Sequence, residues 1–188
     1  MAEAAALAAE ELQVAGERSH STTHKFKRLW RHRLASARRV RAVFDEAALD
    51  RVQSAVAEGE NLHRGEIHFA VEAELDLYQL WASMTPRERA LQVFAEQGIW
   101  DTEENTGVLI YLLWADHDVE IIADRGAHRI LPAARWDEIC ATMARACRDG
   151  RHVDGVVSAI RALNEELRVA LPAQGVNPDE LPNRPTLL

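Results

Sequence analysis

The sequence predicts an α/β protein: a three-layer α/β/α sandwich on a small mixed β-sheet, with a helical basic arm before it. Residues 65–74 alternate between apolar and polar side chains, which is typical of a strand with one wetter face. Residues 108–114 are seven consecutive apolar side chains, which fits a central strand covered on both faces. Residues 18–41 contain nine Lys and Arg and no acid, so they form a distinct basic segment.

The length and composition indicate one globular domain with additions at its ends. The chain has 188 residues, of which 47% are apolar and 28% charged, as in ordinary soluble proteins. Two cysteines exclude a disulfide framework, and no stretch has the roughly 18–20 consecutive apolar residues of a membrane-spanning helix. Glu3, Glu10 and Glu11 stand where a signal peptide would carry basic and apolar residues. We therefore expect a cytoplasmic protein.

The charge is unevenly distributed along the chain. The net charge is −8, yet residues 42–188 hold 26 acidic and only 13 basic side chains, behind the nine basic residues of the arm. Such asymmetry predicts that the arm binds something negative. The acidic body would repel phosphates, so we expect no nucleic-acid partner.

The arm also has an amphipathic pattern. At about 100° per residue, residues 25–44 form one helix with an apolar stripe that includes Phe26, Trp30, Val40 and Phe44. Three interpretations are open: the stripe packs on the protein's own body, it lies on an anionic membrane surface, or it contacts an acidic protein partner. The candidate membrane or partner contacts are Phe26, Lys27, Arg28, Trp30, Arg31, Arg38 and Arg39.

The elements of the body follow from caps and apolar periodicity. Asp45 is placed to cap a helix that runs to about Gly59, and Thr85 with Glu88 forms a capping box for a helix over 86–97. That helix connects the strand at 65–74 to the run at 108–114, so these two strands should be parallel. Residues 119–123 follow 108–114 after a tight turn and should pair with them as an antiparallel hairpin.

Two further helices and a tail complete the chain. Pro132 opens a helix that carries Cys140 and Cys147, which are about 10 Å apart along its axis and should be buried thiols rather than a disulfide. A second apolar-faced helix continues to about Leu167. The predicted organisation is a helical arm at 1–41, an α/β/α domain at 42–171 and a flexible Pro-rich tail at 172–188.

Carboxylates near strand ends are the only candidate chemical groups. Asp116 and Asp118 follow the apolar run, and Asp124 follows the second strand of the hairpin. Converging carboxylates could hold Ca²⁺ or Mg²⁺, whereas acids in turns also serve simply as turn formers. A second acidic group around Asp101 precedes the run. The chain has no GxGxxG, Walker A or GxSxG motif, which removes support for dinucleotide enzymes, P-loop NTPases and serine hydrolases.

Several segments together resemble one bacterial family. They are GEIHFAVE at 65–72, RALQVF at 89–94, WDTEENTGVLIYL at 100–112, VEIIADRG at 119–126, and Trp136. In this order they resemble the TPM-domain family over about residues 40–170. The resemblance implies an α/β/α sandwich. It also implies a contested function: some members are credited with acid phosphatase activity or bind divalent cations, and others act in membrane-protein maintenance or as accessory subunits.

The resemblance, with the basic arm, favours a non-enzymatic accessory or adaptor protein. Many relatives have a signal peptide and a C-terminal membrane helix or Gly-rich tail, and this sequence resembles a shorter branch without them. We expect the arm to take the place of an anchor, at an anionic membrane surface or on a membrane-associated protein, peripheral to the inner face of the membrane. The alternative is a divalent-cation-dependent phosphatase that uses Asp116, Asp118 and Asp124 with Ca²⁺ or Mg²⁺.

Overall fold

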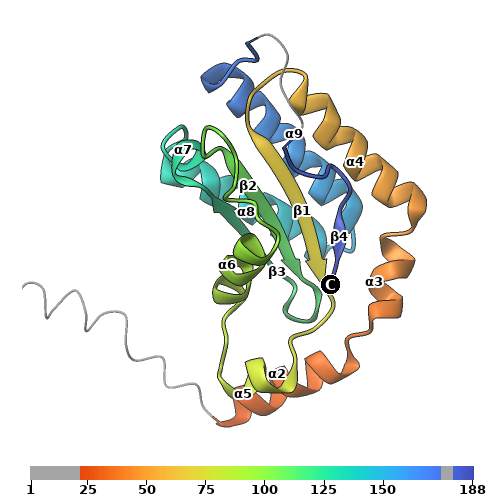
Figure 1. The fold of residues 1–188 in the computed structure, drawn as a ribbon. Coiled ribbons are helices and arrows are strands. Elements are labelled where there is room, and N and C mark those ends of the chain that lie inside the picture. Colours follow the sequence, from red (N-terminus) through yellow and green to blue (C-terminus); the bar gives the residue numbers. More distant parts are fainter. Residues whose placement is uncertain (1–21, 175–179) are drawn as a thin grey trace, which may run out of the picture. The chain divides into compact units, whose positions relative to one another are not determined.

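The computed structural model describes residues 22–174 and 180–188, with the side chains from residue 27 onward (Figure 1). The chain divides into two units, Met1–Trp30 and Arg31–Leu188, and the sheet belongs to the second. In chain order the elements are α2 (Thr22–Leu34), α3 (Ala37–Val43), α4 (Glu46–Glu60), β1 (Glu66–Glu72), α5 (Leu77–Trp81), α6 (Pro86–Glu96), β2 (Gly107–Leu113), the 3₁₀ turn η1 (Trp114–Asp116), β3 (Asp118–Ala123), α7 (Arg125–His128), α8 (Ala133–Arg148), α9 (His152–Ala170) and β4 (Thr186–Leu187).

The four strands form one mixed sheet in the order β3-β2-β1-β4. Strand β1 is parallel to β2, and the register runs from Glu66 opposite Gly107 to Glu72 opposite Leu113. Strand β3 is antiparallel to β2, as a hairpin requires. The predicted parallel pair and the predicted hairpin are therefore both confirmed.

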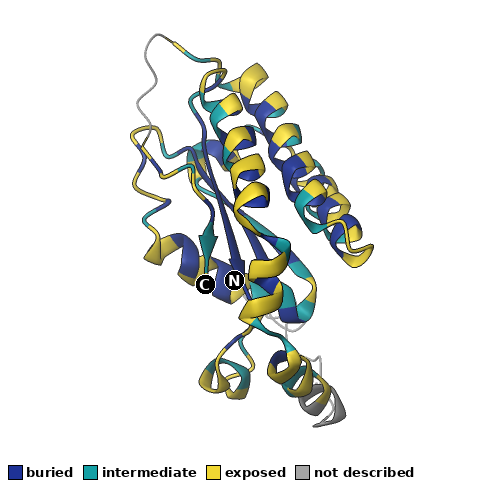
Figure 2. Cartoon of the chain, turned by 90° about the vertical axis from the view of Figure 1, so that its right-hand side faces the viewer, coloured by how far each residue is buried: buried dark blue, intermediate teal, exposed yellow. Residues whose placement is uncertain are grey.

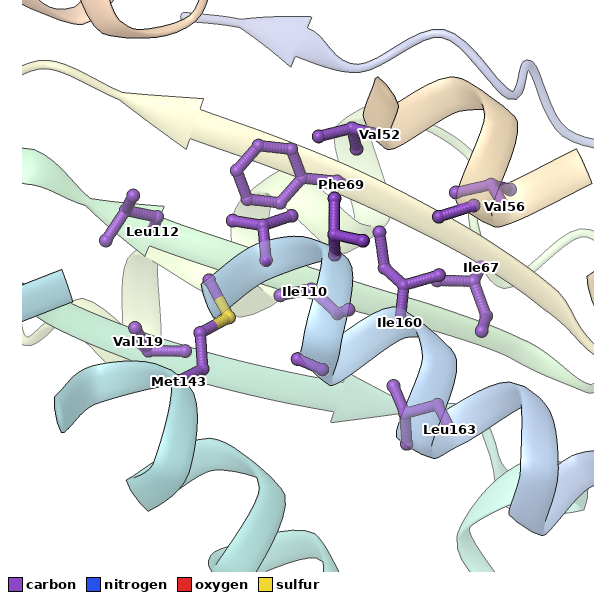
Figure 3. Packing of buried hydrophobic residues seen from close by; sticks show 14 of the residues in the cluster. Val52, Val56, Ile67, Phe69, Ile110, Leu112, Val119, Met143, Ile160 and Leu163 are labelled. Carbon is purple, nitrogen blue, oxygen red and sulfur yellow. The ribbon is translucent and has the colours of Figure 1, made fainter. Parts of the chain in front are cut away.

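Helices cover both faces of the sheet, which confirms the predicted α/β/α sandwich. On one face, α4, α8 and α9 bury the largest cluster, in which Ile160 and Met143 pack over Phe69 and Ile110 (Figure 3). On the other face, Val93 of α6 packs with residues of β1 and β2. Each fully buried aliphatic or aromatic side chain contributes about 1.5–3 kcal/mol, so both layers stabilise the sheet.

The helix starts follow the caps expected from the sequence. The Asp45 side chain accepts the Ala48 N–H at 2.9 Å and so caps α4. Thr85 and Glu88 form a reciprocal capping box at α6, with Pro86 at its first position. Each cap satisfies backbone donors that a helix leaves without partners.

The arm is not one helix, which corrects the prediction for residues 25–44. Helix α2 ends at Leu34, and Ser36, in an extended conformation, caps the separate helix α3 by accepting the Arg38 N–H at 3.3 Å. Val40 and Phe44 are buried in the core, where the rings of Phe44 and Phe69 lie 5.5 Å apart. The segment predicted as an arm at 1–41 therefore contains one residue of the hydrophobic core, Val40, near its end.

Two further predictions are wrong in part. All seven residues of β1 are buried, whereas one face was expected to be wetter. The C-terminal stretch predicted as a flexible tail ends in β4, which pairs in parallel with Ala70 and Val71 of β1. The reason is that the His68 side chain of β1 bonds both Pro182 and Thr186, so this stretch lies over the polar face of the strand. No helix within the described ranges is long and apolar enough to cross a membrane.

Candidate functional site

The end of α2 is attached to the body through His32. This side chain is only 1% exposed, and its Nδ1 accepts the backbone N–H of Leu75 at 2.9 Å. Its Nε2 lies 3.2 Å from a carboxylate oxygen of Asp116. Because Nδ1 accepts a hydrogen bond, the ring proton sits on Nε2, toward the carboxylate. His32 therefore joins α2 to two loops beyond the carboxyl ends of β1 and β2.

Asp116 belongs to this attachment. Arg31 donates to its second oxygen at 2.9 Å, and the Asp116 side chain is only 8% exposed, against 53% for Arg31. The Arg31 guanidinium balances the charge of this carboxylate, and the His32 ring lies against its other oxygen. Asp116, predicted as a metal ligand, instead holds the end of α2 against the turn after β2 through Arg31 and His32.

The other two predicted metal ligands lie apart. Asp118 accepts the backbone N–H of Val119 at 2.9 Å, and Asp124 caps α7 by accepting the Arg125 N–H at 2.6 Å. Asp118 begins β3 and Asp124 follows its last residue. A strand of this length spans about 20 Å, so Asp124 cannot share an ion with Asp116 and Asp118. No group of three His, Cys, Asp or Glu arranged to hold a metal occurs among the described residues, and this set does not fit one Ca²⁺ or Mg²⁺.

In the acidic group that precedes β2, the Glu104 carboxylate forms an ion pair and the backbone of Glu103 forms a loop hydrogen bond. Glu104 pairs with Arg64, and the Glu103 backbone N–H donates to Glu180 at 3.1 Å. These contacts tie the loop before β2 to the segments around it, which is a structural role.

Beyond the break at Ser36, basic side chains project outward. Arg33, Arg38, Arg39 and Arg41 are all exposed, and within the described part of the chain no carboxylate lies within ion-pair distance of them. On α3 the buried Val40 anchors the helix that carries Arg38, Arg39 and Arg41, and Figure 2 shows that exposed residues lie along the outer faces of the helices. We call these four exposed cationic side chains the basic surface (Arg33, Arg38, Arg39 and Arg41).

The remaining predicted contact residues have mixed positions. Trp30 is 61% exposed and Lys27 is exposed, whereas Arg28 is half-buried. The side chain of Phe26 lies outside the described residues. Leu34, in the apolar stripe of α2, is 67% exposed. The stripe is therefore divided: Val40 and Phe44 belong to the core, and Trp30 and Leu34 face solvent.

Sequence reasoning missed α5, a five-residue helix between β1 and α6. None of its residues is buried, and Leu77, Tyr78 and Trp81 are 63%, 80% and 83% exposed. A reciprocal capping box between Asp76 and Gln79 fixes its first turn. Asp and Gln at this spacing were the signal in the sequence that could have found the helix.

A buried polar network lies near the same end of the sheet. Glu72, the last residue of β1, accepts from Arg89 Nε at 2.9 Å and from the hydroxyl of Tyr111. Burial, followed by the charge of Glu72, raises the pKa of Tyr111 well above its usual range, so it stays a donor. Arg89 also reaches Glu96 at 3.2 Å. The network ties α6 to β1 and β2 and leaves no free acid or base for catalysis.

Both cysteines are free thiols, as the helix spacing predicted. Cys147 is buried and Cys140 half-buried, with its thiol donating to the Val119 carbonyl at 2.9 Å. Burial raises the pKa of both thiols to about 11. They are unreactive at neutral pH, because the thiolate is the nucleophile.

Comparisons with known proteins agree with this architecture. A family model described as the TPM domain matches residues 39–166. Among solved structures, the chain is similar to the NMR structure of the BA42 protein from the psychrophilic bacterium Bizionia argentinensis, with a TM-score of 0.68 and 23% identity. That match covers 76% of this chain and 93% of the other, and it shows a shared fold. No curated protein matches the sequence.

Proposed function

The chain belongs to the TPM-domain family, and on that premise we propose that it is an accessory protein that binds anionic membrane surfaces through its basic surface. In this proposal the basic surface binds the anionic lipids, and the α/β/α body contacts membrane-associated proteins. The proposal concerns binding and assigns no reaction.

The proposal rests on the exposed arginines of the basic surface, which have no carboxylate partner among the described residues. The body has a large excess of carboxylates, yet among the described residues none pairs with Arg33, Arg38, Arg39 or Arg41. Arg31 shows that the body can neutralise an arginine when the geometry suits, through Asp116. The basic surface therefore stays available for an external anion.

A membrane also fits the apolar side chains beside this charge. Leu34, the neighbour of Arg33, is 67% exposed, and exposed apolar residues next to arginines are typical of helices at a lipid interface. Each Lys or Arg close to an anionic leaflet contributes about 1 kcal/mol, so four arginines supply roughly 4 kcal/mol at moderate salt. That attraction should weaken as salt rises, because it acts within a Debye length.

The test is co-sedimentation of the full chain with vesicles of phosphatidylcholine alone or with phosphatidylserine. We expect binding only to the anionic vesicles. The variant Arg38→Glu/Arg39→Glu/Arg41→Glu should lose it, because the attraction becomes repulsion. The matched control is Arg129→Glu/Arg145→Glu/Arg148→Glu, which makes the same charge change at exposed positions elsewhere. Equal binding by the two variants, or no binding by the wild type at low salt, would refute the proposal.

Substitution is a better test here than truncation. Removing residues 1–41 would also remove the buried His32 and Val40. A truncated protein could then fail to bind because it is unfolded, whereas exposed arginines can be replaced without touching the core.

The alternative of a cation-dependent phosphatase gains no specific observation. Its three carboxylates are divided between the two ends of β3, and Asp116 is paired with Arg31. Arg125, the only arginine next to one of these carboxylates in the sequence, is exposed beside the cap of α7. The phosphatase is therefore no part of the proposal.

A further inference from the structure

The exposed face of α5 is unusual for a well-formed element. Leu77, Tyr78 and Trp81 point three large apolar side chains into solvent, and Trp81 is 83% exposed. A helix this short normally persists because it buries an apolar face. Here the capping box of Asp76 and Gln79 holds the turn, and Leu80 packs beneath it against the cluster on the α6 face. Helix α5 thus forms a small tip (Leu77–Trp81) whose exposed apolar side chains do not pack inside the protein.

This tip lies beside the start of the basic surface. The segment that leads into α5 contains Leu75, whose N–H is bonded to His32 at 2.9 Å. The next two residues along α2 are Arg33, which is exposed, and Leu34, which is 67% exposed. Cationic and apolar side chains from two segments far apart in the sequence are therefore held together at one end of the body.

We propose that the face formed by Leu77, Tyr78 and Trp81 enters the headgroup region of the same anionic bilayer and provides the apolar half of the contact. This inference rests on the proposed function and adds a second contact to it. Tyr and Trp concentrate at membrane interfaces, because their rings are apolar at one end and hydrogen-bonding at the other. Arginines beside them would meet the lipid phosphates at the same level.

The charges around the tip are compatible with this orientation. Glu74 and Asp76 are exposed at its base, but the Asp76 carboxylate points back into the helix as its cap, at 2.7 Å from the Gln79 N–H. Exposed apolar residues also occur on other elements, such as Leu91 on α6, Trp100 before β2 and Val169 on α9, and scattered residues of this kind are normal on protein surfaces. The α5 tip instead brings three of them together on one short helix, two residues after the Leu75 N–H that is bonded to His32, the neighbour of Arg33.

The first test places an environment-sensitive fluorophore on the tip. Tyr78→Cys introduces one exposed thiol, whereas Cys147 is buried and the half-buried Cys140 thiol donates to the Val119 carbonyl, so labelling favours position 78. With a nitrobenzoxadiazole label, we expect brighter, blue-shifted emission when vesicles containing phosphatidylserine are added. The matched control is Trp100→Cys, another exposed aromatic position, whose label should not respond. Unchanged emission at position 78 on protein that does co-sediment would overturn the inference and leave the proposed function standing.

The second test measures affinity. Leu77→Ser/Tyr78→Ser/Trp81→Ser should weaken vesicle binding by tenfold or more, since burial of even one such side chain is worth about a factor of ten. The loss should persist at high salt, unlike that of the arginine variant. Because none of these residues is buried, the circular dichroism spectrum should be unchanged. If this variant bound vesicles as tightly as the wild type, the inference would be overturned, and the face would serve another partner such as a protein. If the wild type itself did not bind, the proposed function would be refuted.

Discussion

The Nδ1 atom of His32 accepts the backbone N–H of Leu75 at 2.9 Å, across a long separation in sequence. Since His32 also contacts Asp116, this one ring connects α2, the loop after β1 and the turn after β2. The basic surface begins at the next residue, so its position on the body depends on this bond.

Replacing His32 should therefore destabilise the protein. His32→Ala leaves the Leu75 N–H and part of the Asp116 carboxylate buried without partners, which costs about 1–3 kcal/mol. Urea denaturation followed by circular dichroism measures the free energy of unfolding. His128→Ala is the matched control, because His128 is exposed and its loss should change stability by less than about 0.5 kcal/mol. Equal effects of the two substitutions would contradict a role for the bond.

Stability should fall as the pH is lowered below 6.5. Burial lowers the pKa of His63 and of His68 from their ordinary value of 6.5. Below pH 6.5 these histidines bind protons more readily in the unfolded chain than in the folded one. Their contribution to the free energy of unfolding is therefore complete above pH 6.5 and is lost as the pH falls toward the folded pKa values. The measurement is the free energy of unfolding in urea at pH values on either side of 6.5. In His68→Gln, this pH dependence should be smaller, and an unchanged slope would count against His68.

A methyl group at Gly126 should not fit. A Cβ there would stand 2.4 Å from the Asn105 carbonyl oxygen and 2.5 Å from that of Glu104, and both are backbone atoms that cannot swing aside. We expect Gly126→Ala to cost about 3 kcal/mol through overpacking. Gly98→Ala is the comparison: its φ is +66° with open space around it, so it should cost only about 1 kcal/mol of backbone strain. Thermal denaturation distinguishes the two, and similar melting temperatures would be inconsistent with the close approach.

The buried ion pair of Glu72 and Arg89 should behave as a coupled unit. Arg89→Met leaves the Glu72 carboxylate buried and unpaired, which costs about 3–5 kcal/mol. Tyr111→Phe removes one hydrogen bond and should cost about 1 kcal/mol. A double-mutant cycle compares Glu72→Leu, Arg89→Met and the double variant Glu72→Leu/Arg89→Met. The double variant should lose less stability than Glu72→Leu and Arg89→Met lose together. Additive losses would mean that the pair does not interact.

The sheet and its main helices could be predicted because their patterns are local. The apolar run at 108–114 and the hairpin after it lie next to each other in the chain, and Asp45 and Thr85 cap within three residues of themselves. For the same reason the parallel pairing of β1 and β2 followed from the helix between them.

What could not be predicted depends on contacts between distant residues. The polar face of β1 is buried because His68 bonds Pro182 and Thr186, and nothing near His68 in the sequence indicates this. The break of the arm at Ser36 likewise separates a part anchored by His32 from a part anchored by Val40. In the candidate site, the charge of the arm was visible in the sequence. The pairing of Arg31 with Asp116 could not be predicted, because the two residues are far apart in the sequence.

The pairing of β4 with β1 has a consequence for the solution behaviour of the protein. Strand β1 lies between β2 and β4, and the backbone ladder between β1 and β4 pairs Ala70 with Thr186 and Val71 with Leu187. If the last residues were cut away or pulled loose, β1 would become an open edge with unpaired N–H and C=O groups along an apolar strand. Such an edge can recruit strands from other molecules, and Thr186 and Leu187 cover it at Ala70 and Val71.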